Sequence, residues 1–129
     1  MVGLVHDAGT TVGAGQSHTN GDGVTLSTDA GSSGTATINP TTGNGNSSTE
    51  VVTKTRWSGT VSGIDNNDSV DVKASSKGTV SGTGGSVSLA GGCEVTVTNT
   101  DTGNGTITVN LPSGGSATVK SGSSVTFNT

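Results

Sequence analysis

Large aromatic side chains and cysteine are nearly missing from this sequence. Its 129 residues include one Trp, one Phe, no Tyr, one Cys and two Pro. The single cysteine, Cys93, excludes an internal disulfide, which is the usual stabiliser of small secreted domains. A chain with so few large side chains has a thin core, so burial against neighbouring chains is favoured and we expect an oligomer.

Charge is also scarce, and this excludes further classes of protein. Charged residues make up 11% of the chain and the net charge is −4, so the cationic surface of a nucleic-acid-binding protein is missing. No run approaches the roughly 18 apolar residues of a membrane helix. Residues 1–7 lack the cationic and apolar regions of a secretory signal, so we expect synthesis in a cytoplasm.

Small and β-branched residues dominate instead. The chain holds 24 Thr, 23 Gly, 19 Ser and 16 Val, whereas good helix formers are few. Its apolar residues alternate with polar ones, as at Val95 and Val97 or at Ile107 and Val109, which is typical of strands with one buried face. We therefore predict an all-β fold, an antiparallel β-sandwich resembling a jelly roll.

The alternation and the turn residues divide the chain into segments. Residues 1–22 have few apolar residues after Val5, and we expect an extended N-terminal arm that is ordered by other chains through Val2, Leu4 and Val5. Residues 23–129 form one β-domain. Its predicted strands are 23–27, 34–39, 50–57, 59–62, 68–74, 78–82, 86–90, 93–99, 105–111, 116–120 and 123–128.

Two features inside the domain concern topology. Residues 93–128 are expected to be a four-stranded meander, with a hairpin at Asn104-Gly105 and turns at 112–115 and 121–122. The sequence Gly-Thr-Val-Ser-Gly occurs at 59–63 and again at 78–82. Chance and a doubled hairpin both stay open as explanations, and a single repetition is too little for a solenoid, which needs at least about three units.

Groups that could support catalysis or bind a metal do not converge in this sequence. His6 and His18 both lie in the arm, Asp7 beside one of them, and no base is close to Cys93, so we expect no catalytic residue, no cofactor and a buried apolar role for Cys93. The loops 65–68 and 101–105 gather the oxygen ligands that Ca²⁺ prefers, but they lack the spacing of a calcium loop. Calcium and metal-free Asx turns both stay open for them.

Surface motifs offer little more. Trp57 could stack on a sugar ring, but a core position is favoured because large side chains are so few. Six Thr-x-Thr triplets occur where chance predicts about 4.4, too few for the flat threonine array of an ice-binding face. The glycosylation sequons at Asn46, Asn67 and Asn104 also occur at the chance frequency.

In size, composition, arm and the segment CEVTVTNTDTGNGTITVNLPSGGSATVKSGSSVTF at 93–127, the chain resembles the decoration or cement proteins of tailed-phage and related viral capsids. The resemblance implies a small β-rich oligomer, often a trimer, that binds and reinforces an assembled shell. It also implies the major capsid protein or copies of the chain as partners, and the virion surface as the location. No functional residue is carried over.

Two other functions remain open from the sequence. One is a carbohydrate- or receptor-binding module on a virion or cell surface, which would use Trp57, and the other is a subunit of an extracellular filament or coat. Nucleic acid and membranes are not expected partners.

The alternation makes one prediction about stability. Aspartate at Val97 or Val109, both expected to face inward, should lower the free energy of unfolding by several kcal/mol, because a charge would lie in an apolar core. Urea denaturation measures the effect, and aspartate at Thr96, expected to face outward, is the control. Equal losses for Val97 and Thr96 would contradict the predicted strand orientation.

Overall fold

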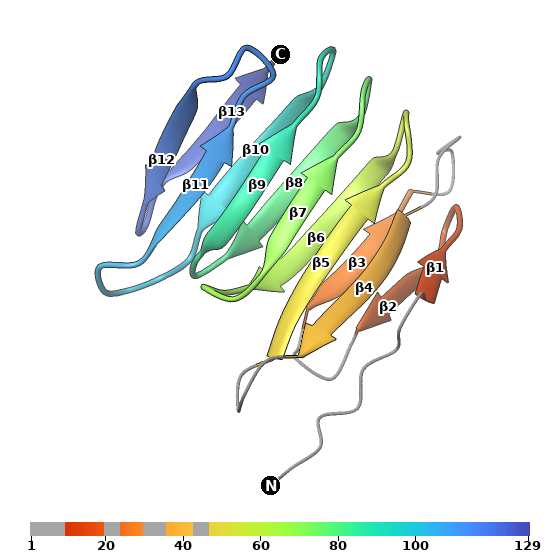
Figure 1. The fold of residues 1–129 in the computed structure, drawn as a ribbon, viewed down its shortest axis with the longest axis horizontal. Coiled ribbons are helices and arrows are strands. Elements are labelled where there is room, and N and C mark those ends of the chain that lie inside the picture. The colour runs from red at the N-terminus through yellow and green to blue at the C-terminus, as the bar shows by residue number, and fades with distance from the viewer. Residues whose placement is uncertain (1–9, 20–23, 30–35, 43–46) are drawn as a thin grey trace, which may run out of the picture.

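The computed structural model describes residues 10–19, 24–29, 36–42 and 47–129 (Figure 1). Within these ranges the chain forms strands, turns and bends, and no helix. The strands are β1 (Thr10–Val12), β2 (Ser17–Thr19), β3 (Thr25–Thr28), β4 (Ala36–Thr42), β5 (Ser47–Thr53), β6 (Ser58–Ile64), β7 (Ser69–Val72), β8 (Lys77–Gly82), β9 (Gly85–Leu89), β10 (Glu94–Asn99), β11 (Thr106–Asn110), β12 (Ser116–Lys120) and β13 (Ser124–Asn128). The predicted all-β class is confirmed.

The strands form two mixed sheets that lie face to face (Figure 1). Sheet A has the order β1-β4-β5-β7-β9-β11-β12, and sheet B has the order β13-β10-β8-β6-β3-β2. From β5 to β11 the chain alternates between the sheets, so each strand pairs in parallel with the strand two further along. The two sheets are therefore arranged like a β-solenoid, with one strand of each coil in each layer.

The antiparallel sandwich or jelly roll expected from the sequence is not confirmed, because the central strands are parallel. Antiparallel pairs occur toward the two ends, where β4 pairs with β5, β3 with β6, β11 with β12 and β10 with β13. A parallel pair needs a long crossover between its strands. Here each crossover is the strand that the coil contributes to the opposite sheet.

The stacking of the coils places valine on valine through the core. Val51, Val70, Val87 and Val109 are register partners across sheet A, and Val61, Val80 and Val97 are partners across sheet B. All seven are at most 1% exposed. The predicted burial of Val97 and Val109 is thus confirmed.

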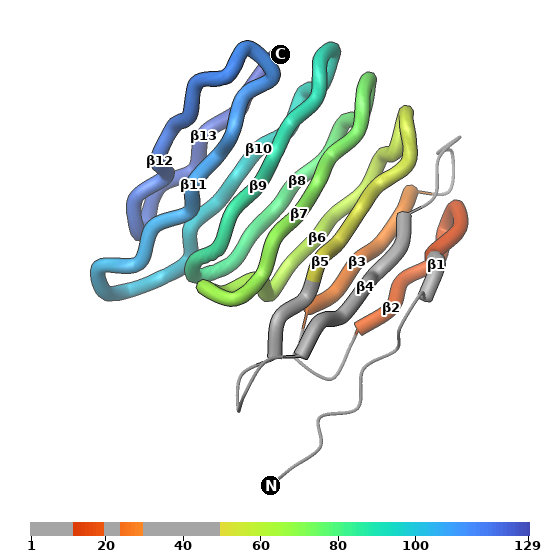
Figure 2. Tube along the Cα trace, viewed as in Figure 1, coloured from red at the N-terminus to blue at the C-terminus, as the bar shows by residue number. Residues whose placement is uncertain are grey.

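The turns between β-strands repeat as well (Figure 2). Arg56 and Ser75 have φ values of 64° and 62°, and Gly92 has 74°. These residues stand at matching places in successive coils, since the Arg56 N–H donates to the Ala74 carbonyl and the Ser75 N–H to the Gly91 carbonyl. A residue in the left-handed backbone conformation, which glycine adopts most readily, thus recurs at one edge of the solenoid.

The expected four-stranded meander over 93–128 is wrong, because β10 and β11 belong to different sheets. The Asn104-Gly105 pair lies in the crossover between them. The carboxylate of Asp101 accepts hydrogen bonds from the N–H groups of Gly103 and Gly105, at 3.0 and 2.7 Å. This side chain shapes a loop in place of the predicted hairpin.

The turns expected after β11 and β12 do occur. Residues 112–115 lie in the hairpin between β11 and β12, whereas the turn at 121–122 carries the chain from sheet A to sheet B. Gly122 has a φ of 77° there.

The repeated sequence at 59–63 and 78–82 is also a structural repeat. The prediction that it does not indicate a solenoid is therefore wrong. Gly59 pairs with Gly78, and the next three positions pair Thr with Thr, Val with Val and Ser with Ser. Gly59 lies against the backbone of β3, where a Cβ would be 2.0 Å from the Ser27 carbonyl oxygen, and Gly78 faces Trp57. A Cβ at Gly78 would lie 2.3 Å from the Gly59 carbonyl oxygen and 2.9 Å from the Trp57 ring. Gly78 thus leaves room for the Trp57 ring, and Gly59 for the backbone of β3.

Residues 10–19 also depart from the expected arm. β1 pairs with β4 and β2 with β3, so this segment lies in the sheets of its own domain. Val12 is 2% exposed, and the Gly15 N–H donates to the Thr28 carbonyl at 3.0 Å. The contact residues Val2, Leu4 and Val5 lie outside the described residues.

The glycine contact yields a prediction. We expect Gly78→Ala to lower the free energy of unfolding by about 2 kcal/mol or more, because its methyl group would overlap backbone and indole atoms. Gly91→Ala is the matched control, since a Cβ there would meet nothing within 4 Å. Chemical denaturation of both variants measures the difference, and a Gly78→Ala variant as stable as Gly91→Ala would contradict this packing.

Candidate functional site

The residues singled out in the sequence do not come together. Trp57 is fully buried, and its indole N–H donates to the Ser27 carbonyl at 3.2 Å. The favoured core position of Trp57 is confirmed. Its ring is not exposed, so it is not available to stack on a sugar. Cys93 is 3% exposed and its thiol donates to the Lys73 carbonyl at 3.2 Å, which confirms its burial. His18 lies in β2, whereas His6 and Asp7 lie outside the described residues.

The two acidic loops use their carboxylates to bind their own backbone. Asp65 accepts the Asn67 N–H and Asp68 accepts the Asp65 N–H, each at 2.9 Å. Asp101 holds the crossover loop in the same way. In the described part of the chain, no three acidic, His or Cys side chains lie close enough together to hold a metal ion. The bonds from the Asn67 and Gly103 N–H groups to the carboxylates two residues earlier are those of Asx turns.

The outer surface of sheet B carries the most regular chemistry of the molecule. Alternation turns every second side chain of each strand outward, and the register aligns these side chains into rows across the sheet. Two rows cross all six strands and contain only Ser and Thr. We call these twelve residues the hydroxyl face: Ser17, Ser27, Thr60, Thr79, Thr96 and Thr126 in one row, and Thr19, Thr25, Ser62, Ser81, Thr98 and Ser124 in the other.

The backbone sets the spacing of the hydroxyl face. Neighbouring strands of a sheet are roughly 4.8 Å apart, and residues two apart along a strand are roughly 6.6 Å apart. Several hydroxyls pair across strands: Thr96 with Thr126 at 2.8 Å, Thr98 with Ser124 at 2.8 Å, and Thr19 with Thr25 at 2.7 Å. These pairs hold the side chains in defined rotamers. The result is a nearly uniform lattice of groups that both donate and accept hydrogen bonds.

Charge is kept to the margin of this face. The next row outward holds Ser58, Lys77, Glu94 and Asn128, with Lys77 and Glu94 paired at 3.5 Å. The outer surface of sheet A is more mixed, because Glu50, Val52, Asp71 and Asn110 interrupt its rows. The two faces therefore differ in chemistry although they share a backbone geometry.

The hydroxyl face was missed in the sequence because Thr-x-Thr triplets measure order along one strand only. Of the six strands, only β10 has threonine at both outward positions. The recurring Thr60 and Thr79 in the Gly-Thr-Val-Ser echo were the available signal, since they lie side by side in the sheet.

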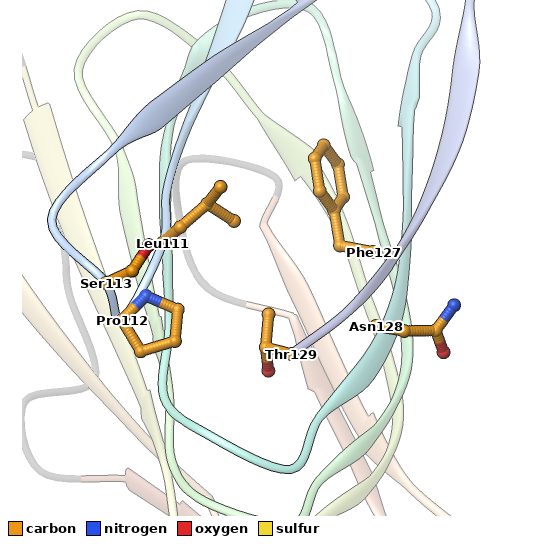
Figure 3. A pocket seen from close by; sticks show the side chains of 6 residues that line it. All are labelled: Leu111, Pro112, Ser113, Phe127, Asn128 and Thr129. Carbon is orange, nitrogen blue, oxygen red and sulfur yellow. The ribbon is translucent and has the colours of Figure 1, made fainter.

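A second feature lies at the end of the solenoid formed by β12 and β13. Leu111, Pro112, Ser113, Phe127, Asn128 and Thr129 line an open cavity of about 340 Å³ (Figure 3). Leu111 and Phe127 are half-buried and pack against the edge of the core. This end therefore exposes apolar surface that the hydroxyl face lacks.

No family model, curated protein or solved structure matches this chain. The described residues contain no helix long and apolar enough to cross a membrane.

The contacts of these carboxylates with the backbone predict the response to calcium. We expect millimolar Ca²⁺ to leave the Tm unchanged relative to EDTA, because the Asp65, Asp68 and Asp101 carboxylates already accept backbone N–H groups. Differential scanning calorimetry measures this, with Mg²⁺ as the control for ionic strength. A rise in Tm with Ca²⁺ alone would show that one of these loops binds the ion.

Proposed function

We propose that this chain is a non-catalytic structural protein that binds and reinforces an assembled protein shell, and that the hydroxyl face is the surface it lays against that shell. The observation that carries the proposal is the complete occupation of two rows by Ser and Thr. The shell as partner comes from the resemblance to capsid decoration proteins, and it implies the virion surface as the location.

The hydroxyl face suits a broad contact with many weak bonds. Each hydroxyl donates one hydrogen bond and accepts others, so it can meet peptide groups directly or through water. A single neutral hydrogen bond contributes only about 1 kcal/mol net. Twelve such groups on a rigid sheet, multiplied by many copies on one shell, give avidity without a deep pocket.

Ice is a second candidate partner, favoured by the regular spacing of the same face. Ice presents oxygen atoms on a fixed repeat, and a lattice of neutral hydroxyls can order water on a repeat of its own. The in-register rows provide a regular array of hydroxyls that the triplet count did not indicate. Neither row contains a charge that would hold a disordered hydration shell.

The hydroxyl face can be tested with one matched pair of variants. Thr79 lies in the middle of the hydroxyl face, and Ser86 lies at an outward position in the middle of sheet A. Thr79→Lys introduces a long charged side chain and should reduce binding at least tenfold, whereas Ser86→Lys should bind as the unaltered chain does. Both should change stability by less than about 1 kcal/mol, since both positions are outward.

Two binding assays distinguish the two partners. The first is co-sedimentation with particles, purified on a density gradient, from the organism that carries the gene. The second is partition into slowly grown polycrystalline ice. Loss of sedimentation for Thr79→Lys alone supports the shell, and loss of ice partition for Thr79→Lys alone supports ice. Binding that Thr79→Lys and Ser86→Lys affect equally would remove the hydroxyl face from either function.

A further inference from the structure

The four edge strands of the described sheets differ in how they are protected against pairing with another chain. β1 and β2 have three residues each, and β12 carries Lys120. Short length and lysine are both common means of protecting an edge. β13 has five residues, Ser-Val-Thr-Phe-Asn, with no charge and no proline. Of the four, β13 is the edge without such protection.

The backbone groups on the free side of β13 can be identified by alternation. The Thr129 N–H donates to the Cys93 carbonyl, and the Ser123 carbonyl accepts the Asn99 N–H, so odd-numbered residues point their backbone groups toward β10. In an antiparallel pair these directions alternate residue by residue. The N–H and carbonyl groups of Ser124, Thr126 and Asn128 therefore point away from β10, along the free edge.

Apolar surface is exposed at the same edge. Val125 is 39% exposed, and it is the one large hydrophobic residue among the described side chains that reaches this exposure. It faces the core side of sheet B as the partner of Val97, but no described strand covers its outer flank. Phe127, two residues on, lines the cavity (Figure 3). An edge with free backbone groups and apolar side chains favours strand addition.

We infer that β13 pairs antiparallel with β13 of a second copy, about a two-fold axis at Thr126. In this register Thr126 lies opposite Thr126, and Ser124 lies opposite Asn128, so the outward backbone groups of each strand meet those of the other. Val125 lies opposite Phe127 in the non-hydrogen-bonded pairs, where side chains are closest. A β-branched residue against an aromatic ring is a stabilising cross-strand pair.

The pairing inside the chain already has this composition. β10 places Val95 opposite Phe127, Thr96 opposite Thr126 and Val97 opposite Val125. A second β13 would therefore present to the free edge nearly the same residues that β10 presents to the inner edge. This self-complementarity is the reason to choose a second copy as the partner.

The same axis can bring the sheet A edges together. The Leu111 N–H donates to the Gly115 carbonyl, so alternation leaves the backbone groups of Ser116, Thr118 and Lys120 on the free edge of β12. A two-fold axis at Thr118 places Ser116 opposite Lys120. β12 and β13 lie at the same end of the two layers, so the pairing of β13 also brings the β12 edges of the two copies toward each other (Figure 1).

This dimer does not depend on the proposed function, because it uses the edge of sheet B and leaves the hydroxyl face open. A two-fold contact closes on itself. It therefore gives a dimer of the chain, in contrast to the trimer implied by the resemblance and to an open filament.

Proline at position 126 provides the first test. The Thr126 N–H points to the free edge, so Thr126→Pro removes no backbone hydrogen bond within one chain but blocks two at the axis. It also removes the hydroxyl that pairs with Thr96. Thr126→Val is the control, since it loses the same hydroxyl and keeps the N–H. Light scattering after size exclusion should show twice the chain mass for the unaltered protein and for Thr126→Val, and a single chain for Thr126→Pro with an unchanged circular dichroism spectrum.

A cysteine pair tests the register. Directly opposed residues of a hydrogen-bonded antiparallel pair have Cα atoms about 5.5 Å apart, within the range for a disulfide. Thr126→Cys should form a disulfide-linked dimer on mild oxidation, whereas Thr79→Cys, in the same row but in the middle of the sheet, should not. A single-chain mass at the highest soluble concentration, a trimer, or equal crosslinking by both cysteines would overturn the two-fold pairing of β13.

Discussion

The in-register stacking of successive coils is the constraint on which the rest of this structure depends. Parallel pairing of β5, β7, β9 and β11, and of β6, β8 and β10, places like positions on one another. The inward positions then form continuous columns of valine, which interlock well because branched side chains pack closely on a pleated surface. A chain with little apolar volume obtains a dry core in this way, because each valine is covered by the equivalent residue of the next coil.

The same stacking also explains how the residues that interrupt the valine columns are accommodated. Trp57 is much larger than the residues at equivalent places in the following coils, Ser76 and Cys93. Gly78 leaves room for its ring, and the Ser76 hydroxyl accepts the backbone N–H of Trp57 at 3.1 Å. Asn99 is buried at the crossover between β10 and β11. Its side-chain amide donates to the carbonyls of Gly105 and Val119, both at 2.9 Å. Each irregular residue is therefore matched by a specific partner, and the coil spacing is kept.

The same geometry also determines the surface chemistry of the molecule, and it gives different results on the outer face of sheet B and at the β13 edge. On sheet B the register converts isolated Ser and Thr residues into two rows, which are neutral and uniform. At the β13 edge the ladder stops with backbone groups unpaired and Val125 uncovered. The first surface suits broad, weak contact with an extended partner, and the second suits a short and specific contact between strands. An assembled structure could use both without competition.

The sequence by itself determined the all-β class, because alternation and turn residues act over a few neighbouring positions. All eleven predicted strands from 23–27 to 123–128 overlap observed ones, and only the three-residue strands β1 and β2 were missed. The burial of Trp57 and Cys93 was also readable from composition. The tertiary structure alone decided which strands pair, and with it the parallel coils, the crossover at Asn104-Gly105 and the hydroxyl face. Pairing joins residues 17 to 22 positions apart, as between Val51, Val70, Val87 and Val109, and no local pattern specifies which strand lies beside which.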